Sequence, residues 1–381
     1  MLPALVFLAL AAFAAALLGS SQIGRAAVVH LMLAVGAMPL IFGAMSHFIP
    51  VLTRTRTATA GLLGIPVLAL AGGALAVGSF IYPDIMMRGQ FAGALLAAIA
   101  ATALLVWSRR RRAGMLGRPH PCLAWYETAL ACLVLALVAI LASVFWPQQA
   151  MALRRLHLHL NTLGFVGLTA LGTLGVLLPT VTNRPDPEAA QRMRRDLPWA
   201  IAGTLLIAVG AAWIGPLAGV GGVIWAVPLL RMGAGWLWRY RTEIFARHGA
   251  APLLATAVVG LGFSAAVGAM SLLPATAAFQ SATPVWAFVA GFMLPLVSGA
   301  ASQLLPVWLR PGVQGTWHAR LRDMLGRHAG VRAVLFLIGG MAAGTGQDWG
   351  LLLAGATLLW FILQTVTALL RARNIHQGNI S

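Results

Sequence analysis

The chain has 381 residues, of which 60% are hydrophobic and only 9% are charged. Soluble domains carry about 25% charged residues, so this composition excludes a soluble globular protein and indicates a polytopic membrane protein. The formal net charge of +18 does not indicate a nucleic-acid-binding protein, because the basic residues are arginines in short loops between apolar segments. That distribution is the charge bias of membrane topology.

The apolar segments predict an all-α protein with about twelve transmembrane helices, since a spanning helix needs about 20 apolar residues. The first segment has no positive charge before it, so we expect a retained helix and not a cleaved signal peptide. The expected spans lie near residues 2–19, 27–50, 60–81, 90–107, 122–146, 157–180, 197–214, 217–238, 251–272, 285–308, 330–346 and 349–370.

The arginines predict the orientation of these spans. Most of them lie in loops on the side that also holds both ends of the chain. Arginine-rich loops stay inside the cell, so we expect both termini in the cytoplasm and the protein in the inner (cytoplasmic) membrane. The lipid bilayer is then its first partner. Arg154, Arg155, His157 and His159 are expected on the opposite, periplasmic side.

A pattern recurs three times along the chain. The stretches "FGAMSHFIPVLTRTR", "LGTLGVLLPTVTNR" and "SGAASQLLPVWLR" each place a glycine seven residues before a proline. The prolines, Pro50, Pro179 and Pro306, are spaced by 129 and 127 residues and end three of the expected spans. The chain therefore reads as one transmembrane domain of three four-helix units, near 1–115, 116–248 and 249–381. We expect the three glycines to let a neighbouring helix approach closely; they are Gly43, Gly172 and Gly299.

The position 20 residues before each proline is His30, His159 and Trp286 in the three units. Twenty helical residues span about 30 Å, the thickness of the hydrocarbon core. Both histidines should therefore lie at the periplasmic end of their helices, where two repeat-related helices can bring them to one site. His157 lies about 200° around the helix from His159, so only one of the two can face a common ligand. His159 is the first choice because it occupies the repeat position.

Neutral imidazole is the commonest protein ligand for haem iron, copper and zinc. Two histidines from facing helices can hold a haem between them, and His157 is the alternative ligand on the second helix. Arg154 and Arg155 are expected in the loop just outside, where they can pair with haem propionates. Asn161 and Thr162 follow and can supply hydrogen bonds to the ligands.

Copper is an alternative occupant of the same site. Four methionines are expected near the same face, and thioether with imidazole suits Cu(I). Methionine is also a common filler of apolar helices, so these residues do not decide between the two cofactors. They are Met32, Met86, Met87 and Met151.

Two charged residues fall inside expected spans. Glu127 lies in "CLAWYETALACL" and Arg231 in "VPLLRMGAGWLW". Ionisable groups within a membrane are costly and usually functional. They leave two alternatives open: a secondary transporter or carrier with a polar path that involves Glu127 and Arg231, or a ligand-free assembly partner of a respiratory complex.

The stretches "HLMLAVGAMPLIFGAMSHFIPVLTR" and "HLHLNTLGFVGLTALGTLGVLLP" resemble helices of divergent relatives of the haem–copper oxidase catalytic subunit. Those relatives include the NnrS family of haem- and copper-containing membrane proteins. The resemblance implies twelve helices in three units, a low-spin haem ligand at His30, and a metal ligand at His157 or His159. It also implies a role in redox support, cofactor handling or nitric-oxide stress tolerance, with a respiratory or electron-donor protein as partner.

The chain departs from the oxidase pattern on two helices. The resemblance requires histidines on spans 7 and 10, yet "PWAIAGTLLIAVGAAW" and "VWAFVAGFMLPLVSGAASQLLP" contain none. The oxygen-reducing centre of the oxidases is therefore not encoded. If the chain is an enzyme, the resemblance implies a haem- or copper-dependent oxidoreductase of another kind.

Overall fold

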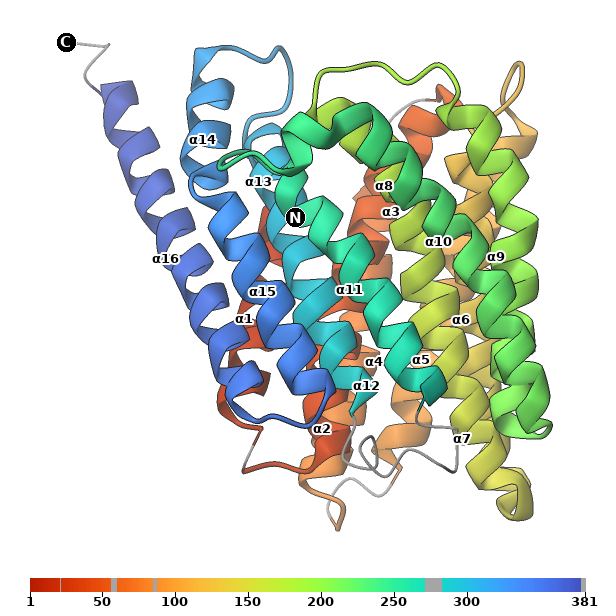
Figure 1. Ribbon diagram of the computed structural model, residues 1–381. Helices are drawn as coiled ribbons and strands as arrows, with labels where there is room; N and C mark the ends of the chain where they lie inside the picture. Colours follow the sequence, from red (N-terminus) through yellow and green to blue (C-terminus); the bar gives the residue numbers. More distant parts are fainter. Residues whose placement is uncertain (21, 56–59, 85–87, 271–282, 378–381) are drawn as a thin grey trace. The chain divides into compact units, whose positions relative to one another are not determined.

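The computed structural model describes residues 1–20, 22–55, 60–84, 88–270 and 283–377 (Figure 1). Within these residues the secondary structure is helical throughout, as the sequence predicted. The elements that concern the site and the packing are α1 (Leu2–Leu18), α2 (Arg25–His30), η1 (Leu31–Ala37), α3 (Met38–Thr53), α4 (Gly64–Ile81), α5 (Gly89–Ala113), α6 (Cys122–Phe145), α7 (Ala150–His159), η4 (Leu160–Gly167), α8 (Leu168–Val181), α9 (Ala189–Ala212), α10 (Gly215–Ile244), α11 (Ala251–Met270), α12 (Pro284–Trp286), η6 (Ala287–Met293), α13 (Leu294–Leu309), α14 (Thr316–Gly326), α15 (Ala329–Gly344) and α16 (Trp349–Gln377).

Ten helices in the described part of the chain are long and apolar enough to cross a membrane. The protein is therefore a multi-pass membrane protein. Two of the twelve expected spans are shorter apolar helices, Leu2–Leu18 and Ala329–Gly344. The two-residue connection between α9 and α10, Trp213 and Ile214, separates two spans where the sequence predicted a break.

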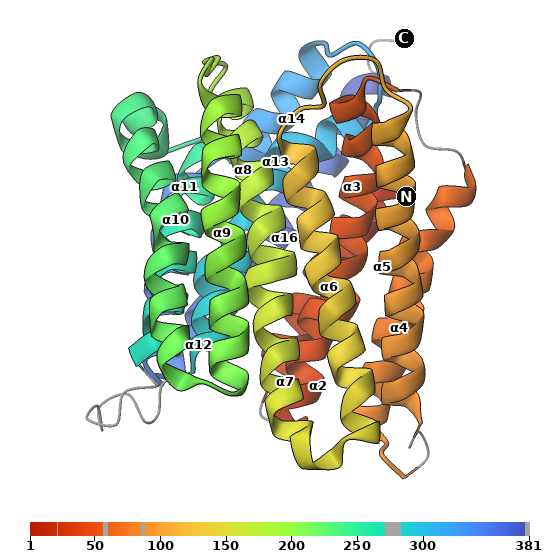
Figure 2. The same ribbon diagram turned by 90° about the vertical axis from the view of Figure 1, so that its right-hand side faces the viewer.

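The chain divides into two compact units. Unit 1 comprises residues 1–176 and 186–229, and therefore holds α1 to α7, η4, the first part of α8, α9 and the first half of α10. In it α4 packs on α5, α5 on α6, and α6 on both α7 and η4. Figure 2 shows that α2 and α7 occupy the same end of this unit. The two expected liganding helices thus belong to one unit.

Unit 2 comprises residues 177–185 and 230–381. It holds the end of α8, the second half of α10 and the helices from α11 to α16. In it α11 packs against α13, α15 and η6, and α15 packs against α16. The backbone of α10 leaves helical geometry at Tyr240, where φ is −123°.

Three segments within the long helices are π-helical, with one extra residue per turn. They are η1, η4 and η6, which begin immediately after His30, His159 and Trp286. Each π segment packs against an earlier helix: η1 against α1, η4 against α6, and η6 against α11. Such wide turns are rare and frequently occur at functional sites.

The predicted close approach at the three repeated glycines is confirmed. A Cβ at Gly43 would lie 2.6 Å from Leu5 of α1, and one at Gly172 would lie 2.7 Å from Trp125 of α6. A Cβ at Gly299 would lie 3.0 Å from Leu253 of α11. Each glycine therefore lets its helix pack on the same earlier helix that its π segment contacts.

The expectation that the repeated prolines end their helices needs correction, because each helix continues for two or three residues beyond the proline. The first two helices end instead in left-handed residues, Arg54 and Asn183. The amide of the following residue donates to the carbonyl of Pro50 in one case and of Pro179 in the other. Proline is tolerated there because it lies in the last turn, and the left-handed residue stops the helix.

Candidate functional site

His30 is the last residue of α2 and lies beside two rings of unit 1. Its ring centroid is 4.7 Å from that of Phe80 on α4 and 6.5 Å from that of His157 on α7. The imidazole planes of His30 and His157 are nearly parallel, with an interplanar angle of 11°. Two histidines 127 residues apart in the sequence are thus neighbours within one unit.

Hydrogen bonds set which nitrogen of each imidazole carries a proton. The Nδ1 of His30 lies 2.8 Å from the carbonyl oxygen of Ala26, and the Nδ1 of His157 lies 2.9 Å from that of Ala136 on α6. A carbonyl oxygen only accepts hydrogen bonds, so Nδ1 is the donor in both rings. The Nε2 of each neutral ring then keeps its lone pair. A backbone carbonyl that orients a histidine in this way is the usual partner of a metal-ligating imidazole.

The pairing of His30 with His159 is revised by this geometry. In the described part of the chain the ring contacts of His30 are to Phe80 and His157, and none joins it to His159. The Nδ1 of His159 donates to the carbonyl of Arg155 on its own helix, over 2.8 Å. Positions two residues apart point to opposite sides of a helix, so the helix that directs His157 at His30 turns His159 away.

Arg154 and Arg155 lie inside α7 and not in a loop before it. The apolar helical run begins at Pro147 and covers 35 residues, or about 52 Å at 1.5 Å per residue. It is longer than the hydrocarbon core, so its first turns extend beyond the apolar layer and can carry charge. Both arginines are exposed, and the Nη1 of Arg155 lies 3.5 Å from the carbonyl oxygen of Ala211.

One of the two expected supporting residues contacts the histidine pair. The side-chain amide of Asn161 donates to the carbonyl of His157 over 3.0 Å and lies 3.3 Å from both nitrogens of its ring. Thr162 donates instead to the carbonyl of Leu158 on its own helix. Phe80, which sequence reasoning missed, is the further neighbour; its position at the end of the third span was the available signal.

The methionines distribute unevenly around this region. Met32, two residues beyond His30, is fully buried, whereas Met151 is 61% exposed. Met86 and Met87 lie outside the described residues. Among the described residues no group of three or more His, Cys, Asp or Glu side chains could hold a metal ion.

The centroid distance of the two rings can be compared with that expected for a metal ion held between two imidazoles. An ion bonded to a nitrogen of each ring at about 2.0–2.1 Å separates those nitrogens by about 4 Å. Half a ring on each side brings the centroids to about 6 Å for rings that meet edge to edge. The observed distance is 6.5 Å; these two imidazoles could hold a haem iron or a copper ion, once the Asn161 amide, 3.3 Å from the Nε2 of His157, moves aside.

Glu127 has a local partner. Its carboxylate accepts hydrogen bonds from Arg112, at 2.8 Å, and from Ser108, at 3.2 Å, both on α5. The Glu127 side chain is 7% exposed and that of Arg112 is 50% exposed. The carboxylate therefore links α5 to α6. Arg231 belongs to unit 2, on the second half of α10.

Comparison with known proteins relates part of the chain to one class of enzyme. No protein-family model matches the chain. A cytochrome c oxidase subunit 1 of Thermus thermophilus is 39% identical over 62 residues, which are 16% of this chain and 11% of that protein. A second Thermus thermophilus sequence of that description is 38% identical over 60 residues, which are 16% of this chain and 56% of that protein. The chain thus matches less than two thirds of the length of either relative, and its likeness to oxidase subunit 1 is local.

Proposed function

We propose that this chain is a membrane protein that binds haem through His30 and His157. The observation that carries the proposal is the pair of nearly parallel imidazoles, 6.5 Å apart, each with its Nδ1 committed to a carbonyl. The local likeness to cytochrome c oxidase subunit 1 supports haem as the group that these residues hold.

The residues around the pair have separable roles. Ala26 and Ala136 fix the ring tautomers through their carbonyls, and Asn161 holds the α7 backbone at His157. Arg154 and Arg155, one turn before the ligand, are placed to attract the propionates. A haem with two imidazole ligands supplies a one-electron redox couple whose potential the protein tunes.

Copper at the same two histidines is the second candidate. The fully buried Met32 lies two residues beyond His30, and a thioether next to imidazoles favours Cu(I). A two-coordinate ion also needs less space between the helices than a macrocycle does. The histidine ligands are the same in both cases, so the choice concerns the occupant and not the site.

We further propose that the oxidase-like architecture extends to all three four-helix repeats expected from the sequence, near 1–115, 116–248 and 249–381. The three π segments begin at Leu31, Leu160 and Ala287, with spacings of 129 and 127 residues. Those are the spacings of the repeated prolines. Each π segment, and the glycine that follows it, packs on the first helix of its own four-helix repeat. A threefold repeat of one helix arrangement accounts for all of these coincidences.

The proposed role is redox support, cofactor handling or nitric-oxide tolerance, in the manner of NnrS-like proteins, and not oxygen reduction. Residues 197–214 and 285–308 contain no histidine, so the ligands that a second haem and its copper would need are missing from those helices. A carrier is disfavoured because Glu127, one of its two coupling groups, is held by Arg112 and Ser108.

The test is the optical spectrum and metal content of protein purified in detergent. We expect a Soret band, a pyridine-haem signal and iron at one equivalent or less. Colourless protein that contains copper would show that copper, the second candidate, is bound at these histidines in place of haem. Colourless protein without metal, from cells supplied with both haem and copper, would refute the proposal.

Substitution of one ligand sharpens this test. His30→Ala should lower the cofactor content at least about tenfold. His47→Ala is the matched control, because His47 lies on the same long helix, 17 residues further along, or about 25 Å from His30. Equal retention by the two variants would exclude His30 as a ligand.

A further inference from the structure

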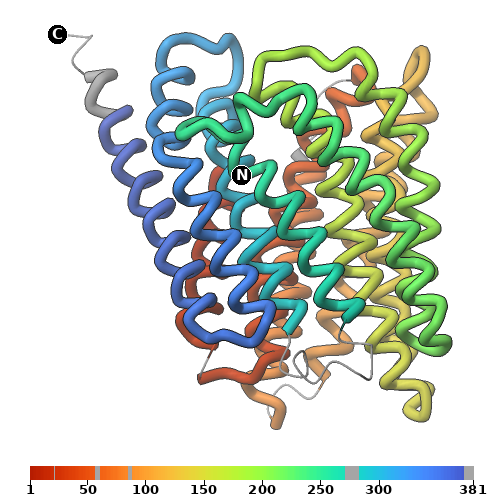
Figure 3. The backbone as a smooth tube through the Cα atoms, viewed as in Figure 1, coloured from red at the N-terminus to blue at the C-terminus, as the bar shows by residue number. Residues whose placement is uncertain are grey.

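An apolar groove opens on unit 2 between the end of α10, α11 and α15. Its volume is about 630 Å³. The helices α11 and α15 pack on each other, and Figure 3 shows their backbones. Several large apolar side chains that line it are exposed; they are Leu237, Phe245, Val259, Val331 and Val334. Val259 and Val334 are 53% and 55% exposed. In a membrane protein such a groove faces hydrocarbon and can hold an acyl chain.

One end of the groove is positively charged. Arg247 lines it there, together with Pro252 at the start of α11 and Gly330 at the start of α15. The dipoles of these two helices favour an anion near their first turns. An arginine and two helix N-termini therefore meet where the apolar groove ends.

The loops that carry this charge are fixed to each other. The amide of Gly249 donates to the carbonyl of Gly326 over 2.9 Å, and that of Gly330 donates to the carbonyl of Arg247 over 3.1 Å. A Cβ at Gly330 would lie 2.6 Å from the carbonyl oxygen of Ala246, so the close contact requires glycine. Arg327 is on the second loop but lines the neighbouring polar cavity, so the charge at the groove's end comes from Arg247.

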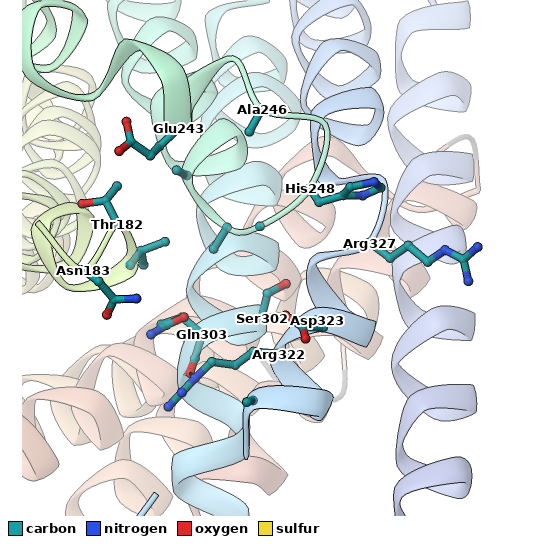
Figure 4. A pocket seen from close by; sticks show the side chains of 15 residues that line it. Thr182, Asn183, Glu243, Ala246, His248, Ser302, Gln303, Arg322, Asp323 and Arg327 are labelled. Atoms are coloured by element: carbon teal, nitrogen blue, oxygen red, sulfur yellow. Dashed lines mark hydrogen bonds between the residues drawn. The ribbon is translucent and has the colours of Figure 1, made fainter. Parts of the chain in front are cut away.

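No carboxylate neutralises this site among the residues that the structure describes. Arg247 and Arg327 take part in none of the ion pairs found there. The nearby Glu243 is bound to Arg184, at 3.0 Å. Glu243 lines a polar cavity of about 680 Å³ together with His248 and Arg327, and Figure 4 shows the side chains of His248 and Arg327 extending away from Glu243 and Asn183.

We infer that the groove binds an anionic phospholipid, with one acyl chain along α11 and α15 and the phosphate at Arg247. The apolar floor of the groove accommodates the acyl chain, and the unpaired charge of Arg247 at the end of the groove favours an anionic headgroup. Basic pockets between transmembrane helices on the cytoplasmic side bind anionic headgroups, and the sequence predicts this face to be cytoplasmic. A phospholipid is the one ligand that satisfies both parts of the groove.

Native mass spectrometry of delipidated protein tests the inference, with phosphatidylglycerol and phosphatidylcholine of equal chain length as probes. We expect phosphatidylglycerol to bind at least about fivefold more tightly, since one arginine near the headgroup is worth about that factor. Arg247→Gln should remove most of this preference and leave phosphatidylcholine binding unchanged. Arg320→Gln, on an exposed part of α14, should change neither.

The groove itself is tested by filling it. Gly233 lines the groove on α10, and a Cβ there would meet nothing within 4 Å. Gly233→Leu should therefore fold normally and weaken binding of both lipids more than about tenfold, because each excluded methylene costs about fourfold. Gly235→Leu is the matched control: its site is equally open but does not line the groove.

Three results would overturn the inference. Equal binding of the two lipids would remove the headgroup site. Equal behaviour of Gly233→Leu and Gly235→Leu would remove the acyl-chain site. Displacement of phosphatidylglycerol by excess inorganic phosphate would indicate a free-anion site in place of a lipid site.

Discussion

Two histidine pairs, one in each of the two compact units, differ in ring geometry and in hydrogen bonding. In unit 1 the rings of His30 and His157 are 6.5 Å apart with planes 11° apart. In unit 2 the rings of His248 and His328 are closer, at 5.4 Å, and are tilted by 60°. Distance alone would favour the second pair as a metal site, yet their hydrogen bonds favour the first.

The difference lies in how each ring uses its Nδ1. In the first pair Nδ1 donates to a carbonyl, which leaves the Nε2 lone pair for a ligand. In the second pair the Nδ1 of His248 accepts a hydrogen bond from the backbone amide of His328, over 3.0 Å. The neutral His248 ring then carries its proton on Nε2 and has no lone pair left for a metal. The first pair is the one we propose to bind a cofactor, and the second joins two loops.

The largest expected effect follows directly from that difference. His157→Ala should remove at least about nine tenths of the bound cofactor, whereas His248→Ala should leave it unchanged, as measured by absorbance per protein and by metal content. His159→Ala should also retain the cofactor, because His159 faces away from His30. Exogenous imidazole should restore the spectrum of His157→Ala, which separates the loss of a ligand from misfolding. Retention by His157→Ala with loss by His159→Ala would reverse the assignment.

A smaller effect is expected from the glycines that position the two pairs. A Cβ at Gly73 would overlap sterically with the Ala34 carbonyl in η1. Gly73→Ala should therefore push α4, with Phe80, away from His30. Gly330→Ala should instead separate the two loops of unit 2. Overpacking of this kind costs about 1–3 kcal/mol, which thermal unfolding will detect. Only Gly73→Ala should also lower the cofactor content.

Gly64→Ala is the control for that comparison. Gly64 begins α4, and a Cβ there would meet nothing within 4 Å. Alanine should be neutral or slightly stabilising at such a position. If Gly64→Ala destabilised the protein as much as Gly73→Ala does, the effect would reflect loss of backbone freedom and not the packing against η1.

Much of the fold could be predicted because hydropathy and charge act over whole helices. The long apolar segments, the short break after Ala212 and the tight approach at Gly43, Gly172 and Gly299 were all foreseen. The π segments were not, because an extra residue per turn leaves composition unchanged and is decided by packing. The sequence also did not predict that the helix ends in the left-handed residue Arg54. Glycine usually occupies such a position, and the nearby proline suggested a different helix end.

The candidate site was predicted only to the level of its helices. Repeat alignment selected His30 and His159, which occupy equivalent positions and make the same bond to a carbonyl four residues earlier. Equivalent positions on two helices need not face each other, because each helix presents its own side to its neighbour. The residue two positions earlier, His157, therefore meets His30. No sequence pattern specified the partner of Glu127 either, because Arg112 is one of four consecutive arginines.

The smallest effect concerns pH and the loop-joining pair alone. The pKa of His328 lies below its ordinary value of 6.5, through partial burial of the ring and the nearby charges of Arg327, Arg247, His248 and Arg332. The ring also lies 6.2 Å from that of Trp360 on α16. A lowered folded pKa means that the open form takes up a proton more readily than the closed form. The closed loops are therefore fully stable above pH 6.5 and lose stability as the pH falls below that value, until the folded form is protonated too.

Hydrogen exchange between pH 7.5 and 5 will measure this loss, after correction for the intrinsic pH dependence of exchange. The amides of Gly249 and Gly330, which join the two loops, should lose protection as the pH falls, and His328→Gln should flatten that dependence. Protection that rises on acidification would show that the closed loops favour the charged His328 ring. The proposed role of the His248–His328 pair in joining the loops of unit 2 would then be wrong.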